Sequence, residues 1–103
     1  MTKPWLPLAQ AVQMLRGHLG VFELGDADGK IIFIGFAGGK SRFGLKSEVA
    51  ASAAGIPGAV QARYEITTAY HTRYRELLMV HKADHGVLPE ANPSIKLGTL
   101  SPL

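Results

Sequence analysis

Two short apolar segments separated by a tight turn constrain the fold of this 103-residue chain most strongly. Residues 21–24 (Val-Phe-Glu-Leu) and 31–35 (Ile-Ile-Phe-Ile-Gly) have the length and residue types of β-strands. The turn between them contains Asp28-Gly29, and both residue types accept the positive φ angles that a hairpin turn requires. The second segment is apolar on both faces, which favours a central position in an antiparallel sheet.

Helices and one further strand are predicted around this hairpin. Apolar residues at helical spacing predict an additional N-terminal helix over about 7–17, and Ser41 is expected to cap a second helix that ends near residue 54. Alternating apolar and polar residues predict a third strand over 60–67, and a last long helix is expected over 69–85. The sequence therefore predicts one α+β domain of order α-β-β-α-β-α, with a three-stranded antiparallel sheet flanked by helices.

Composition and charge limit the classes of protein to which the chain can belong. Hydrophobic residues make up 47% of the chain and charged residues 18%, as in a globular protein. The absence of cysteine excludes disulfides, thiolate metal sites and a cysteine nucleophile. No apolar run reaches membrane-spanning length, so a cytoplasmic protein without a membrane partner is expected. Proline at 89, 93 and 102 predicts an extended tail over about 88–103.

The hairpin resembles part of a known enzyme family. Gly20-Val21-Phe22 and Phe33-Ile34-Gly35 are placed where a GIY-YIG nuclease domain has its two name-giving tripeptides. The order of strands and helices over about residues 19–92 is also similar to that family's core. Three further positions match the family's pattern, namely an arginine on the next helix, a glutamate on the helix after the third strand and a late asparagine near a proline: Arg42, Glu76 and Asn92.

The resemblance implies a metal-dependent chemistry of phosphodiester bonds. It implies that Glu76 holds one Mg²⁺ ion and that Arg42 stabilises charge on the phosphate, while a tyrosine assists the attack. Both motif tyrosines are phenylalanine here, and Phe22 and Phe33 have no hydroxyl that accepts a proton. The expected function is therefore a divergent domain that binds nucleic acid or another phosphate-bearing ligand, with weakened or lost nuclease activity. An active metal-dependent endonuclease and a non-catalytic protein-interaction module are the alternatives.

Basic residues suited to contact DNA or RNA occur on two of the predicted helices. Lys40, Arg42 and Lys46 cluster around the second helix, and His71 and Arg75 line one edge of the last. If both edges face the same way, these side chains form a cationic groove that can follow a phosphate backbone. The alternative is that they are ordinary solvated charges. The net charge of +3 permits an anionic partner without requiring one.

Three other features have a structural interpretation beside a functional one. The glycine-rich residues 35–41 resemble a phosphate-binding loop, but Ile34 stands where the P-loop pattern needs glycine, so a flexible glycine connection is favoured over a site for one phosphate. His81 and His85 have the spacing of a zinc-chelating pair, but a third ligand is missing, and a packing role is expected for His81. Trp5 is expected to pin the N-terminal segment to the core rather than to stack on a base.

Overall fold

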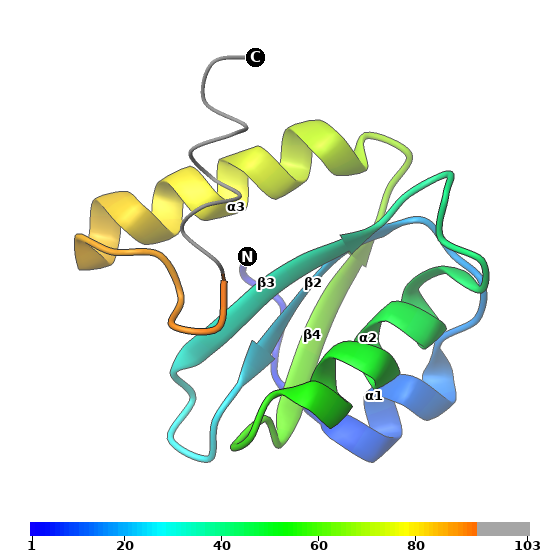
Figure 1. Ribbon diagram of the computed structural model, residues 1–103, viewed down its shortest axis with the longest axis horizontal. Coiled ribbons are helices and arrows are strands. Elements are labelled where there is room, and N and C mark those ends of the chain that lie inside the picture. Colours follow the sequence, from blue (N-terminus) through cyan, green and yellow to red (C-terminus); the bar gives the residue numbers. More distant parts are fainter. Residues whose placement is uncertain (93–103) are drawn as a thin grey trace.

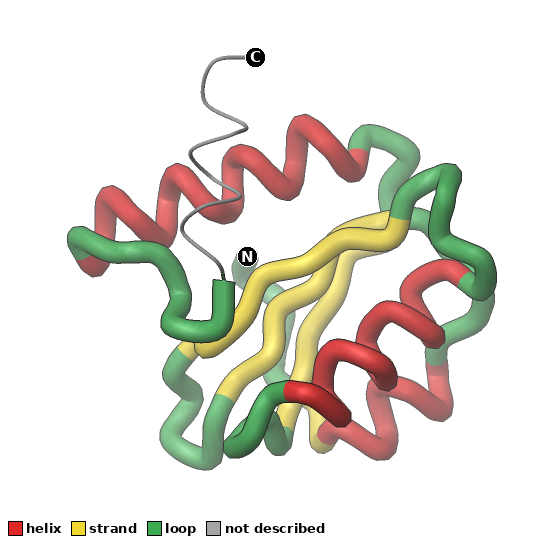
Figure 2. Tube along the Cα trace, in the orientation of Figure 1, coloured by secondary structure: helices red, strands yellow, loops and turns green. Residues whose placement is uncertain are grey.

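The computed structural model describes residues 1–92 as three layers, in which an antiparallel sheet separates two layers of helix (Figures 1 and 2). In chain order the elements are β1 (Leu6–Pro7), α1 (Leu8–Met14), β2 (Gly20–Gly25), β3 (Ile31–Ala37), α2 (Gly44–Gly55), β4 (Gln61–Ile66) and α3 (Tyr70–His85). Helix α3 covers one face of the sheet, and α1 and α2 cover the other. No helix within residues 1–92 is long and apolar enough to cross a membrane.

The sheet has four strands in the order β1-β4-β2-β3, so the prediction of three strands is wrong. The additional strand, β1, has only two residues, with Leu6 paired to Ala62 and Pro7 paired to Gln61. Two residues are too few to show an alternating pattern, and proline without an N–H is tolerated in a strand only at a sheet edge. Pro7 therefore ends an edge strand and precedes α1, instead of beginning the helix.

Strand β3 lies at the edge of the sheet, so the predicted central position of residues 31–35 is also wrong. The central strand is β2, which pairs with β3 on one side and with β4 on the other and is buried along its whole length. The side chains of β3 are apolar on both sides because α3 packs on one face of this strand and α2 on the other. An edge strand between two helices therefore has the same pattern as a central one.

The chain after α3 returns to the outer edge of β3. The N–H of Ala91 donates a 3.0 Å hydrogen bond to the carbonyl of Ile32. The N–H of Ile34 donates to Oδ1 of Asn92, and the carbonyl of Ile34 accepts from Nδ2 of the same side chain, each at 2.9 Å. The Asn92 amide thus takes the place of one residue of a neighbouring strand and satisfies the N–H and the carbonyl of Ile34 at the edge of the sheet. Residues 93–103, the remainder of the predicted tail, lie outside the described residues.

Two apolar clusters hold the layers together. The cluster beneath α1 and α2 combines side chains of the sheet with those of the helices, chiefly Phe22, Leu24, Ile32, Leu45 and Val49. The cluster beneath α3 contains Val21, Ile34, Leu77 and Leu78, with Tyr70 and Tyr74 packed against it. The side chains of α3 in this cluster recur at helical spacing, as an inward-facing stripe of a helix requires.

Helix α2 begins at Gly44, so the predicted cap at Ser41 is wrong. The hydroxyl of Ser41 accepts the N–H of Gly38 at 3.1 Å and makes no cap hydrogen bond to the helix. The first N–H groups of α2 donate instead to backbone carbonyls before β2, from Leu45 to His18 at 2.8 Å and from Lys46 to Arg16 at 3.2 Å. A distant segment of the chain therefore satisfies the start of this helix.

Candidate functional site

A cavity of about 530 Å³ opens beside the edge strand β3. It is lined by residues of the sheet, of the loop between β3 and α2, and of helices α2 and α3. These residues are Phe22, Phe33, Gly35, Phe36, Gly38, Gly39, Lys40, Ser41, Glu48, Ser52, Tyr70, His71 and Tyr74. Most of these side chains are aromatic or small, and Lys40 and Glu48 bring one charge of each sign. Apolar walls with a few polar groups are typical of ligand sites.

The two motif phenylalanines and Gly35 form one packed group in this cavity. The ring centroids of Phe22 and Phe33 lie 5.9 Å apart, and Phe22 is 1% exposed. A Cβ atom at Gly35 would lie 2.5 Å from Cζ of Phe22 and 2.8 Å from Cε2 of Phe33. Glycine is therefore required here because the two rings occupy the space of a side chain. The structure brings these three predicted positions together.

Replacing Gly35 with alanine is expected to lower the free energy of unfolding by about 1–3 kcal/mol, because the buried ring of Phe22 and the half-buried ring of Phe33 must move. Chemical denaturation measures this loss. Gly55→Ala is the matched control, since no atom lies within 4 Å of the added methyl group and φ at Gly55 is not positive. That control is expected to leave stability unchanged or to raise it by up to about 1 kcal/mol. Equal denaturation midpoints for Gly35→Ala and wild type would refute the packing role.

Four aromatic rings cluster where β3 meets α3. The rings of Phe36 and Tyr70 are stacked with 8° between their planes, and Phe36 also contacts His71 and Tyr74 at centroid distances of 5.2 and 4.8 Å. Burial raises the pKa of Tyr74, against a smaller opposite effect of its hydrogen bond with Asn92. The phenol is therefore protonated at neutral pH. The ring of His71 is exposed at the outside of the cluster.

The glycine-rich loop does not present its N–H groups as a phosphate-binding loop would. The N–H of Gly38 donates to Oγ of Ser41, and the N–H of Ser41 donates to the carbonyl of Gly38 at 2.9 Å. The N–H of Gly39 donates to the hydroxyl of Tyr70 at 3.1 Å. Because these three donors already have partners, the alternative of a phosphate contact through them does not fit the structure.

The structure separates the five basic residues that the sequence predicted as a groove. Lys40 and His71 line the cavity. Arg42 and Arg75 are exposed and are not among its lining residues. The Nζ of Lys46 donates at 2.7 Å to the carbonyl of Val12 in α1, so this side chain joins the two helices behind the sheet. The site therefore contains Lys40 and the imidazole of His71, two of the five predicted residues.

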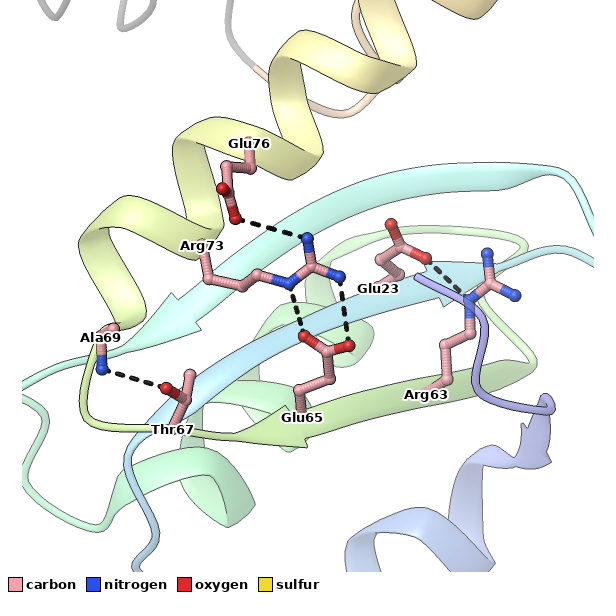
Figure 3. A network of polar contacts seen from close by, with 7 residues as sticks. All are labelled: Glu23, Arg63, Glu65, Thr67, Ala69, Arg73 and Glu76. Carbon is pink, nitrogen blue, oxygen red and sulfur yellow. Dashed lines mark hydrogen bonds and ion pairs between the residues drawn. The ribbon is translucent and has the colours of Figure 1, made fainter.

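Glu76 lies away from the cavity, in a second hollow of about 370 Å³ that Arg73 and Glu65 also line. Its side chain is 57% exposed, and its Oε1 is 3.5 Å from Nη1 of Arg73 (Figure 3). Within residues 1–92 no group of three or more side chains could hold a metal ion. Arg73 is paired with both carboxylates of this hollow, Glu65 and Glu76, so these residues do not supply the free oxygen ligands that Mg²⁺ takes and do not fit the metal implied by the resemblance.

Residues 1–84 match the family described as the domain of unknown function DUF7508. The chain belongs to this family. The matched region includes every residue that lines the cavity, whereas Asn92 lies beyond it. No curated protein and no solved structure matches the chain.

Two arginine–glutamate pairs on the sheet face beneath α3 stabilise the DUF7508 domain (Figure 3). Glu23 is 2% exposed, and its Oε1 accepts a 2.7 Å hydrogen bond from Nε of Arg63. The Arg63 guanidinium also lies 4.2 Å from the ring centroid of Trp5 and donates to the carbonyl of Lys3 at 3.2 Å. These contacts pin the N-terminal segment to the sheet, as the sequence predicted for Trp5.

The second pair, Glu65 with Arg73, makes the stability of the fold depend on pH. Arg73 donates to both carboxylate oxygens of Glu65, at 2.6 and 3.1 Å, and this bonding holds the pKa of Glu65 below its ordinary 4.5. Because the folded state binds this proton less readily than the unfolded state, the pair stabilises the fold above pH 4.5 and loses this effect as pH falls through the lowered pKa.

The free energy of unfolding is therefore expected to fall more steeply with acidification in wild type than in Glu65→Gln. Denaturation curves between about pH 6 and pH 3 measure both slopes. The variant is expected to be less stable at neutral pH and to approach the wild type at the acidic end. Parallel pH profiles for the two proteins would contradict this role of the pair.

His81 packs in the core of the DUF7508 domain, as the sequence predicted. The residue is 8% exposed, and its Nδ1 lies 2.9 Å from the carbonyl of Val87. The ring of His85 is 4.4 Å away, but no third ligand joins the pair within the part of the chain that the structure describes. This hydrogen bond explains how the buried imidazole is satisfied.

Sequence reasoning missed the two residues of α2 that line the cavity, Glu48 and Ser52. Glu48 and Ser52 are four positions apart on α2, and this spacing alone places them on one side of a helix. The direction of that side depends on how α2 packs on β2 and β3, which the sequence pattern does not show. Tyr70 and Tyr74 share the same spacing on α3.

Proposed function

We propose that this DUF7508 domain binds single-stranded nucleic acid in the cavity beside β3. The observation that carries the proposal is the combination of an aromatic cluster with cationic side chains around one open cavity. Proteins that bind single strands combine positive charge, which contacts the backbone, with aromatic rings on which bases stack. A cavity of about 530 Å³ is within the range that holds a nucleotide-sized ligand.

The aromatic cluster supports stacking of a base. Tyr70 and Tyr74 are half-buried and His71 is exposed, so part of the cluster is accessible from outside. These rings are held in place by Phe36 and by the hydrogen bond between Tyr70 and the loop, so little side-chain freedom is lost when a base stacks on them. Such stacking contributes about 1–3 kcal/mol per base and does not require a particular sequence.

Basic residues in and next to the cavity support a contact with the phosphate backbone. Lys40 and His71 line the cavity, and the exposed Arg42 follows Lys40 in the same loop. No described side chain forms an ion pair with Lys40 or Arg42. Among the side chains of residues 1–92, none therefore competes with a phosphate for either cation. A single strand is favoured over a duplex because its bases are free to leave the stack.

The same geometry favours binding over cleavage. Phe22 and Phe33 offer no group that accepts a proton from water, and Glu76 is paired with Arg73 in a different hollow. We therefore propose that this domain, which resembles GIY-YIG nucleases, is a divergent one that has kept a ligand site and has lost hydrolytic activity.

Fluorescence anisotropy with labelled oligonucleotides of about nine uridines or thymidines tests the proposal. Both are expected to bind more tightly than a duplex of the same length, and binding should weaken between roughly 50 and 200 mM salt. Lys40→Gln should reduce the slope of log K against log salt by about 0.7. Lys30→Gln, at the opposite end of β3, removes the same charge outside the cavity and should leave the slope unchanged.

The other outcomes of this experiment would refute either the assigned site or the proposed function. Binding that does not depend on salt, or that Lys40→Gln and Lys30→Gln weaken equally, would refute the assigned site. Cleavage of the oligonucleotides with Mg²⁺ that is lost in Glu76→Ala would establish an active endonuclease instead. Absence of binding by a folded preparation would refute the proposal and leave the protein-interaction alternative.

A further inference from the structure

We infer that Glu48 recognises a guanine base in the cavity, an inference that rests on the proposed binding of single-stranded nucleic acid. Glu48 belongs to α2, on the other face of the sheet from α3, and lines the same cavity as the aromatic cluster of β3 and α3. It is the one carboxylate among the residues that line this cavity. Its position suits a contact with the edge of a base whose face stacks on the aromatic rings.

The Glu48 carboxylate has no ion pair and no side-chain hydrogen bond with any residue in the range 1–92. The two carboxylates on the sheet face beneath α3 differ in this respect, because Glu23 and Glu65 are each bound by an arginine. A half-buried carboxylate without a protein partner loses part of its hydration without compensation. A ligand with N–H donors would supply that compensation.

Guanine is the base whose edge matches a carboxylate. An ionised carboxylate has two acceptor oxygens and no donor. Guanine presents two adjacent donors, N1–H and the N2 amino group, so it can bind both oxygens at once. Adenine and cytosine place a ring acceptor next to their amino group, and uracil places two carbonyls beside its single N–H. Each of these arrangements places an acceptor against a carboxylate oxygen, and two acceptors cannot form a hydrogen bond with each other.

Ser52 provides a second polar group on the same wall. It lies one helical turn beyond Glu48 on α2 and lines the same cavity. Its hydroxyl can donate a hydrogen bond, as the O6 carbonyl next to guanine N1 requires. The two side chains together offer an acceptor and a donor, the two kinds of group that the guanine edge needs. The predicted ligand is therefore a single strand with an unpaired guanine.

The test compares uridine oligonucleotides of about nine residues whose central position is guanosine, inosine, adenosine or uridine. Wild type is expected to bind the guanosine probe about ten-fold more tightly than the adenosine probe. Inosine lacks the N2 amino group and should fall between them. Glu48→Gln should reduce the preference to within about two-fold, whereas the all-uridine probe should bind as it does to wild type. Asp84→Asn removes the same charge on α3 outside the cavity and should keep the preference.

The outcomes separate this inference from the function on which it rests. Equal binding of the guanosine, inosine and adenosine probes by wild type would overturn the inference without requiring any variant to fold. A preference that persists in Glu48→Gln would also overturn it. So would a uniform gain of affinity for all probes in that variant, since Glu48 would then act only by repelling phosphates. Failure of every probe to bind would refute the proposed function itself.

Discussion

Arg63→Met is expected to lower the free energy of unfolding by about 3–5 kcal/mol, because it leaves a buried carboxylate without its partner. Glu23 is 2% exposed in the central strand, and its ion pair within residues 1–92 is with Arg63 at 2.7 Å. Methionine keeps much of the apolar stem beside Trp5, so the loss reports mainly on the charge. Urea denaturation measures the change.

Two further variants separate the buried charge from lost packing. Glu23→Leu combined with Arg63→Met removes both charges and should recover most of the stability, because an apolar pair of similar volume is tolerated in place of a buried ion pair. Arg73→Met breaks a pair whose side chains are 24% and 32% exposed and should cost about 1 kcal/mol or less. If Arg63→Met and Arg73→Met destabilised equally, burial of Glu23 would not control the effect.

Gly44→Ala is expected to destabilise the fold by about 2–5 kcal/mol, because backbone strain and a steric clash act together. Gly44 has φ of +65°, and a Cβ atom there would lie 2.3 Å from the carbonyl carbon of Gly17. This close approach allows the carbonyls of residues 16 and 18 to accept hydrogen bonds from the first turn of α2. The added methyl group must push that segment away and break this cap.

Gly86→Ala is the control for the strain alone. Gly86 ends α3 with φ of +78°, and no atom lies within 4 Å of an added Cβ. Its replacement should cost about 1–2 kcal/mol. Denaturation midpoints of the two variants give the comparison, and circular dichroism shows whether Gly44→Ala also loses helix. A loss at Gly44 no larger than that at Gly86 would show that the contact with Gly17 is unimportant.

The sequence predicted those elements whose pattern is local. The hairpin of β2 and β3, the alternating strand β4 and the inward face of α3 follow from periodicity and turn residues. The strand order does not, because an edge strand covered by two helices is as apolar as a central one. The start of α2 was also missed, since carbonyls from residues 16 and 18 replace the side-chain cap that the sequence suggested.

The candidate site was predictable to a similar extent. The hairpin placed Phe22, Phe33 and Gly35 together, because cross-strand neighbours follow from the register. Glu48 could not be found in this way, since it joins the cavity only through the packing of α2 against the sheet. Glu76 was expected at the site, but it lies beside Arg73 in a separate hollow, because α3 presents that part of its surface to solvent. Long-range packing decides both positions.

The cavity beside β3 is the proposed site at which this DUF7508 domain binds single-stranded nucleic acid. An NMR titration of the ¹⁵N-labelled protein with an unlabelled oligonucleotide of about nine nucleotides tests it without any mutation. The amide signals of Phe36, of residues 38–41 and of His71 are expected to shift together as the oligonucleotide is added. Shifts confined to the hollow of Glu65 and Glu76, or an unchanged spectrum at saturating oligonucleotide, would contradict the claim.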